Sequence, residues 1–143
     1  MVFFIFGMMK DDLQFGDEPI EIQATNKTPY IKLDKLSGMI EISGVSIPEN
    51  TKEFYWQFNR WLSEYSRDPA PQTRVKISLM YMNSSSTVVI TRMLMLLDEL
   101  IGMKTVVEID WHFESDDLEM KEIGQYYQDT MKCKINLHEV DRL

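Results

Sequence analysis

The chain has 143 residues, of which 44% are hydrophobic and 27% charged, as expected for one globular domain. Its formal net charge is −8, and no cluster of Lys and Arg offsets it, so we expect no nucleic-acid binding. The single cysteine, Cys133, excludes an intrachain disulfide and fits a reducing cytoplasm, where we expect the protein to act.

The first nine residues are strongly apolar, but they are too few to cross a bilayer, which takes about 20 residues. They also lack the basic start and small-residue cleavage site of a signal peptide, so we expect no membrane insertion. Because an exposed run of this kind favours aggregation, we interpret Met8 or Met9 as the true translation start, with an extra edge strand as the alternative. We assign residues 1–19 to an N-terminal extension, partly disordered, and residues 20–143 to the domain.

The first predicted elements form a hairpin. Residues 30–34 and 38–43 alternate between polar and apolar side chains, as half-buried strands do. The sequence Lys35-Leu36-Ser37-Gly38 between them is typical of a turn.

A helix start follows at residues 46–53. Both Ser46 with Glu49 and Asn50 with Glu53 have the spacing of a capping box. The large apolar residues that follow share one helical face, and we predict that they are core: Phe54, Phe58, Trp61, Leu62 and Tyr65. The prolines in the segment 68–71 end this helix.

The rest of the chain alternates between strands and helices. We predict strands at 74–81, 105–111 and 134–138, and helices at 87–101 and 116–132, the second capped by Ser115. The order β-β-α-β-α-β-α-β predicts a single α/β domain with a mixed sheet of about five strands and three main helices.

Two segments follow the carboxyl ends of predicted strands, where functional loops gather in such sheets: residues 82–87 and 112–117. The first contains Asn83-Ser84-Ser85-Ser86. These are residue types that cap helices and form turns, and capping alone is the simplest reading. Three consecutive serines nevertheless exceed what a cap needs. We expect their hydroxyls to stand on an exposed rim that a kinase can reach.

The segment from Tyr81 to Thr87, Tyr-Met-Asn-Ser-Ser-Ser-Thr, resembles a Tyr-Phe-Asn-Ser/Thr-Ser-Ser motif of the SiaC family of regulatory phosphoproteins. Further similarities lie in order between about Thr28 and Leu137: Thr28-Pro29, Asp34, Gly38, Gly44-Val45-Ser46, Pro48-Glu49-Asn50, Phe54-Tyr55, Leu96-Leu97-Asp98-Glu99, Trp111-His112-Phe113, Asp116-Asp117 and Gly124. The chain departs from the family pattern at position 88, where a frequent Lys is replaced by Val.

The resemblance implies a fold similar to STAS domains of anti-sigma-factor antagonists. It also implies a partner switch: a cognate kinase phosphorylates the loop, a PP2C-like phosphatase reverses this, and the unmodified form binds and regulates an effector such as a diguanylate cyclase. Such a regulator acts in cyclic-di-GMP signalling and biofilm control. The implied phosphoacceptor is Ser84, with Ser85 and Ser86 as alternatives, and Tyr81, Asn83 and Thr87 support the loop.

Several other readings stay open. The chain could be a STAS-like protein-binding module that no kinase modifies. A small hydrolase is less favoured, because neither a Gly-x-Ser-x-Gly elbow nor a recognisable triad is present, so we expect no catalytic residue. A metal site is also less favoured, because the segment 112–117 matches no known metal-binding spacing, and we expect no metal or cofactor. Six residues are candidates for partner contact: Trp56, Met95, His112, Glu114, Asp116 and Asp117.

Overall fold

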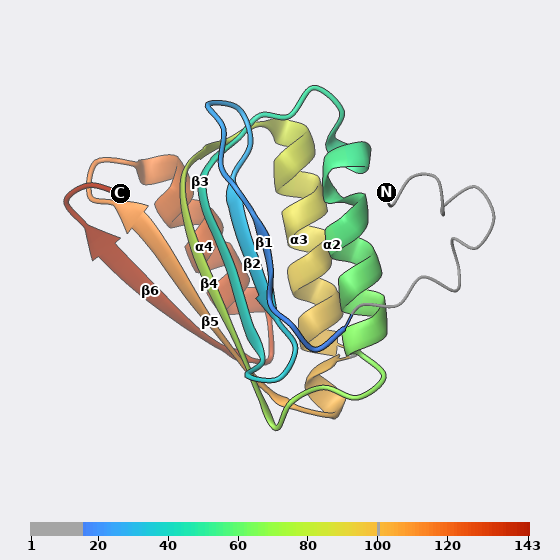
Figure 1. The fold of residues 1–143 in the computed structure, drawn as a ribbon. Coiled ribbons are helices and arrows are strands. Elements are labelled where there is room, and N and C mark those ends of the chain that lie inside the picture. The colour runs from blue at the N-terminus through green and yellow to red at the C-terminus, as the bar shows by residue number, and fades with distance from the viewer. Residues whose placement is uncertain (1–15, 100) are drawn as a thin grey trace.

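Six strands form one sheet in the order β1-β2-β3-β4-β5-β6 (Figure 1). The computed structural model describes residues 16–99 and 101–143. The strands are β1 (Ile20–Ile22), β2 (Tyr30–Asp34), β3 (Met39–Ser46), β4 (Gln72–Met82), β5 (Val106–Glu114) and β6 (Lys134–Val140). The helices are α2 (Thr51–Tyr65), α3 (Ser84–Glu99) and α4 (Leu118–Thr130), with a short 3₁₀ turn, η2, at Ile101–Met103.

The sheet is mixed, as the sequence predicts. Strands β1, β2 and β3 pair antiparallel, whereas β3, β4, β5 and β6 pair parallel. The parallel strands are added in one direction, with one helix in each connection. Because such crossovers are right-handed, all three helices come to lie on the same face of the sheet. In the described part of the chain no helix lies on the other face, and Figure 1 shows α2 and α3 side by side.

The described sheet has one strand more than the predicted number of about five. The additional strand, β1, has only three residues and pairs with β2 at the edge of the sheet. Residues 1–15 lie outside the described part of the chain, and so do the expectations about Met8, Met9 and an edge strand there. No helix in the described residues is long and apolar enough to cross a membrane.

The hairpin of β2 and β3 is confirmed, and Gly38 closes its turn. Gly38 has φ +75°, a left-handed conformation that favours glycine. Its backbone N–H donates to the carbonyl of Asp34 at 2.9 Å. A Cβ at this position would collide with the carbonyl oxygen of Gln72, so both the turn and the neighbouring strand require glycine here.

Helix α2 begins at the second of the two predicted capping boxes. The Asn50 side chain accepts a hydrogen bond from the backbone N–H of Glu53 at 3.1 Å. Ser46 is not a cap, because it ends β3 and is fully buried. The predicted core face is shifted by one residue at its start: Tyr55 is buried, and Phe54 only partly so.

Helix α4 packs closely on β5 through Gly124. A Cβ on Gly124 would lie 2.5 Å from Cδ1 of Trp111 and 2.8 Å from Cδ2 of Leu137. The Trp111 ring is completely buried and donates its Nε1–H to the carbonyl of Met120 at 2.9 Å. The helix is capped by Asp117, which accepts from the N–H of Met120, and not by Ser115 as predicted.

Replacing Gly124 with alanine tests this close packing. On an exposed helical surface the change would stabilise the protein by about 1 kcal/mol through helix propensity. Here we expect the opposite sign, a loss of about 1–3 kcal/mol, because the new methyl group collides with the fixed Trp111 ring. Urea denaturation measures the change. The control is Gln125→Ala on the exposed side of α4, which should leave stability within about 0.5 kcal/mol of the parent. A stabilised Gly124→Ala variant would contradict the packing described.

Candidate functional site

The predicted loop of serines is the first turn of a helix. Strand β4 ends at Met82 and α3 begins at Ser84, so Asn83 alone connects them. The helix therefore begins three residues earlier than the predicted Thr87. We attribute the difference to side-chain capping: Asn83 Oδ1 accepts a hydrogen bond from the backbone N–H of Ser86 at 2.9 Å.

Asn83 and Thr87, two of the predicted loop supports, hold this junction together. The backbone N–H of Asn83 donates to the carbonyl of Ser46 at 3.0 Å, which joins the junction to the end of β3. The carbonyl of Asn83 accepts from the N–H of Thr87 at 2.9 Å and from its hydroxyl at 3.0 Å. Tyr81, the third predicted support, is 54% exposed on β4.

Ser86 faces inward and is completely buried. Its hydroxyl donates to the carbonyl of Ser46 at 3.1 Å and accepts from the Ser46 hydroxyl at 2.8 Å. The hydroxyl of Tyr55 lies 2.6 Å from the same Ser46 oxygen. Burial raises the pKa of Tyr55 to about 12, so its phenol stays neutral at physiological pH. The three hydroxyls join β3, α2 and α3 at one buried point.

Ser84 and Ser85 are exposed, but only Ser85 is held by other side chains. The Ser85 hydroxyl lies 2.7 Å from that of Thr51, the first residue of α2, and donates to Asn83 Oδ1 at 3.2 Å. The Ser84 hydroxyl has no hydrogen-bond partner among the described residues. The three serines therefore differ: one is buried, one bridges two helices, and one is free at the surface.

The electrostatic setting of this turn suits an anion. The first turns of α2 and α4 contain Glu53 and Glu119, whereas the first turn of α3 contains no acidic residue. The positive end of the α3 dipole is therefore not balanced by a side chain of its own first turn. The bond between Thr51 and Ser85 also brings the start of α2 next to it.

The six candidates for partner contact do not lie on one surface. Trp56 and Met95 belong to α2 and α3 in the helical layer, where Trp56 is partly exposed and Met95 is 44% exposed. His112 and Glu114 lie within β5, which extends three residues beyond its predicted end. Asp116 is exposed and Asp117 caps α4. The predicted loop at 112–117 is thus half strand.

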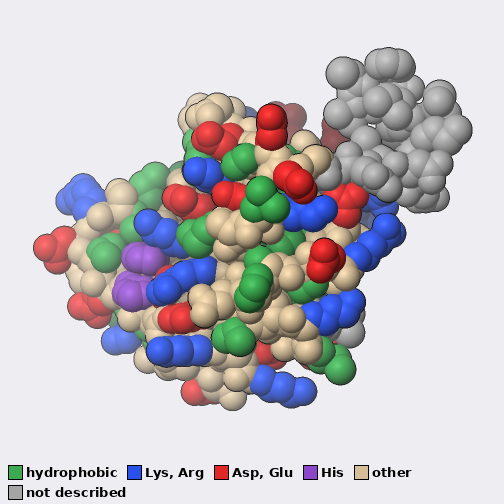
Figure 2. All heavy atoms as spheres, turned by 60° about the horizontal axis from the view of Figure 1, so that its bottom comes forward, with side chains coloured by type: hydrophobic (Ala, Val, Ile, Leu, Met, Phe, Trp, Pro, Cys, Tyr) green, Lys and Arg blue, Asp and Glu red, His purple; other side chains and the backbone are tan. Residues whose placement is uncertain are grey.

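The face of the sheet without helices is polar, and its charges alternate from strand to strand. Glu21, Lys32, Glu41, Lys76 and Asp110 occupy consecutive paired positions on β1 to β5. Opposite charges on neighbouring strands stabilise a sheet by about 0.2–1 kcal/mol per pair. Figure 2 shows basic and acidic side chains interspersed on this side of the molecule, with the two histidines next to each other.

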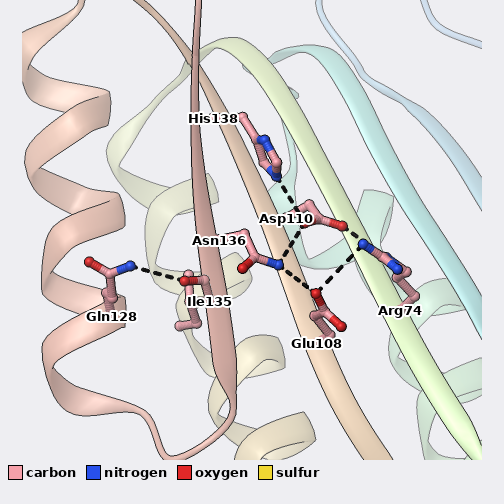
Figure 3. A network of polar contacts seen from close by, with 7 residues as sticks. All are labelled: Arg74, Glu108, Asp110, Gln128, Ile135, Asn136 and His138. Atoms are coloured by element: carbon pink, nitrogen blue, oxygen red, sulfur yellow. Dashed lines mark hydrogen bonds and ion pairs between the residues drawn. The ribbon is translucent and has the colours of Figure 1, made fainter.

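Asp110 is the centre of a network on this face (Figure 3). The residue is 7% exposed. Its carboxylate accepts hydrogen bonds from Arg74 at 3.0 Å and from Asn136 at 3.0 Å, and lies 2.9 Å from Nε2 of His138. Burial alone would raise the pKa of Asp110, but the contacts with His138, Asn136 and Arg74 outweigh it and lower the pKa to about 2. The sequence alone does not indicate this network, because its members are far apart in the chain and meet only through strand register.

The geometry offers little to catalysis or to metal binding. The rings of His112 and His138 stack at a centroid distance of 4.5 Å, and burial, followed by the charge of His138, lowers the pKa of His112. No three side chains of His, Cys, Asp or Glu come together as metal ligands within the described residues. Burial and the neighbouring Asp98 raise the pKa of Cys133 to about 12, which leaves its thiol protonated.

The Asp110 network predicts a specific acid dependence. Because its folded-state pKa is depressed, the Asp110 contribution is present above about pH 4 and is lost as the pH falls through about 2. We expect Asp110→Asn to lower the free energy of unfolding by about 2 kcal/mol at neutral pH and to flatten its pH dependence below about pH 4. Urea denaturation across that range measures both effects. Asp141→Asn, at an exposed position after β6, is the control and should leave both unchanged.

The difference between Ser84 and Ser86 is also measurable. Ser86→Ala leaves the Ser46 hydroxyl without one of its buried partners, so we expect a loss of about 1–3 kcal/mol in unfolding free energy. Ser84→Ala removes an exposed hydroxyl without a partner and should change stability by less than about 0.5 kcal/mol. Thermal and urea denaturation compare the two. Equal effects would contradict the geometry described.

Comparison with known proteins identifies the family. The profile of the SiaC family, described as regulatory phosphoproteins, matches residues 22–140. A sequence relative, named only as an uncharacterized protein of Pseudomonas aeruginosa (strain UCBPP-PA14), is 26% identical over 110 residues, which are 77% of this chain and 87% of the relative.

Solved structures show the same fold. A chain in the crystal structure of the diguanylate cyclase SiaD in complex with its activator SiaC, from Pseudomonas aeruginosa, superposes with a TM-score of 0.77 at 24% identity, covering 85% of this chain and 99% of that one. SiaC of Pseudomonas aeruginosa on its own also gives a TM-score of 0.77, covering 86% and 99%. The predicted α/β fold is confirmed, and so is the expectation of a regulatory protein in place of an enzyme. The chain belongs to the SiaC family of regulatory phosphoproteins.

Proposed function

We propose that the protein is a partner switch whose state is set by phosphorylation of Ser84. The unmodified form binds and regulates an effector, a diguanylate cyclase, as the solved complex of SiaD with its activator SiaC suggests by analogy. A cognate kinase adds the phosphate and a PP2C-like phosphatase removes it. The switch acts in the cytoplasm and controls cyclic-di-GMP.

The single observation that carries the proposal is the difference among the three serines. Ser86 is buried, so a kinase reaches it only after the Ser46 hydrogen bonds break. Ser85 is held by Thr51 and Asn83. Ser84 is exposed and has no hydrogen-bond partner in the described part of the chain. A kinase can therefore transfer a phosphoryl group to the Ser84 hydroxyl more easily than to the other two. Ser84 also directly follows the asparagine of the family motif.

The position of Ser84 also explains how a phosphate would act. Phosphorylation adds about −1.5 to −2 charges and three acceptor oxygens. At the start of α3 these oxygens would be received by free backbone N–H groups and by the helix dipole, so the fold need not change. An effector that docks over this turn would meet a bulky anion. A hundredfold loss of affinity needs only about 2.8 kcal/mol, which one misplaced phosphate supplies.

Mass spectrometry and effector capture together test this function. Protein isolated from its native host should carry an adduct of about 80 Da, the mass of one phosphoryl group, on Ser84. Unmodified protein should capture a diguanylate cyclase from host lysate and change its rate of cyclic-di-GMP synthesis. Protein phosphorylated on Ser84 should bind that cyclase at least about a hundredfold more weakly.

Two variants complete the design. Ser84→Ala should bind the cyclase normally and remain bound when the kinase is active. Ser115→Ala, at an exposed serine before α4, is the matched control and should still be released. A phosphate found on another residue overturns the assignment of Ser84. A chain that binds the cyclase but is never modified is the passive protein-binding module considered above.

A further inference from the structure

A hollow of about 430 Å³ lies in the helical layer between α2 and α3. Six residues line it: Lys52, Trp56 and Asn59 from α2, and Val89, Arg92 and Met93 from α3. Its floor is formed by Trp56, Val89 and Met93, all at least partly buried. We call it the α2–α3 groove.

The groove has a basic rim on an acidic protein. Lys52 and Arg92 are both exposed, one on each helix. Neither forms an ion pair with any described residue, which is also true of most other basic side chains in the described part of the chain. The whole chain carries a net charge of −8, but the only charged residues that line this apolar hollow among those described are these two cations. They complement a partner surface that is apolar in the centre and acidic at its edges.

We propose that the α2–α3 groove binds an amphipathic helix of the effector, with its apolar face on Trp56 and its acidic side chains against Lys52 and Arg92. A helix is favoured over an extended segment by the hydrogen bonds available. The walls are helices, whose backbone groups are already paired, so an extended peptide would find no strand to join. A helix satisfies its own backbone and presents only side chains.

This inference rests on the proposed function and gives it a mechanism. Lys52 follows Thr51, whose hydroxyl is hydrogen-bonded to Ser85, the neighbour of Ser84. The basic end of the groove therefore adjoins the turn that is phosphorylated. A phosphate on Ser84 would attract Lys52 and repel the acidic side chains of the bound helix. The effector helix would then be released by repulsion between like charges as well as by the size of the phosphate.

Peptides of opposite charge test the groove without knowledge of the effector. The probe is a stapled amphipathic helix of about 18 residues, five turns, with leucines on one face and glutamates beside them. A second peptide has lysines in place of the glutamates. The side-chain N–H signal of Trp56 in the NMR spectrum of the full chain reports binding, because Trp61 and Trp111 are at most 2% exposed. A Trp56→Phe variant assigns that signal.

We expect the acidic peptide to shift the Trp56 signal and to bind at least about tenfold more tightly than the basic one. The variant Lys52→Glu/Arg92→Glu should reverse this preference. Arg67→Glu/Lys132→Glu is the matched control, with the same change of charge at two other exposed positions, and should keep it. Equal binding of the two peptides, or no shift of Trp56 up to about 1 mM peptide, overturns the proposal.

The same variants, applied to the captured cyclase, separate this proposal from the proposed function. If the groove variant binds the cyclase as well as the parent does, while phosphorylation of Ser84 still releases it, the groove assignment is wrong and the switch stands. If the acidic peptide binds as expected but unmodified protein captures no cyclase, the groove stands as a site for acidic helices and the proposed effector is wrong.

Discussion

The Ser46 hydroxyl is the contact on which the arrangement of the candidate site depends. It lies at the end of β3, and its partners are Ser86 in α3 and Tyr55 in α2. Since all three side chains are buried, the loss of one would leave polar groups without water or protein to satisfy them. This contact fixes which serine faces inward. Because successive residues of a helix point about 100° apart, it also fixes that Ser84 and Ser85 face outward.

The layering of the fold assigns different roles to its two faces. Opposite charges occupy neighbouring positions on the face without helices, and Asp110 is held there by Arg74 and Asn136. On the helical side, Lys52 and Arg92 flank an apolar hollow and have no ion-pair partner in the described chain. The paired charges around Asp110 contribute to stability, whereas the two cations beside an apolar hollow are placed where the partner helix proposed above would lie.

Most of the fold could be predicted from the sequence because its signals are local. Strand alternation, the glycine turn at Gly38 and the cap at Asn50 each depend on residues within a few positions of one another. The start of α3 could not be predicted in the same way. Four consecutive residues there are all good caps, and only the register with Ser46, 40 residues away from Ser86, decides among them.

The other differences between the predicted and the observed structure also arise from contacts between residues that are far apart in the chain. Strand β1 has three residues and a weak pattern of its own, and it exists because β2 offers an unpaired edge. Tyr55 and Phe54 both adjoin the apolar face of α2, and the contact of the Tyr55 hydroxyl with Ser46, which helps to place Tyr55 inside, is between residues that the sequence pattern does not connect. The three serines could be named as the site from the sequence, but their different environments appear only in three dimensions.

The short connection between β4 and α3 has a consequence for any enzyme that would modify Ser84. Ser84 belongs to a helical turn, so an enzyme that needs its substrate extended must first wait for that turn to fray. Once attached, a phosphate would hold the frayed turn closed. With Ser84 as the acceptor proposed above, opening of this turn would limit the removal of the phosphate as well as its addition.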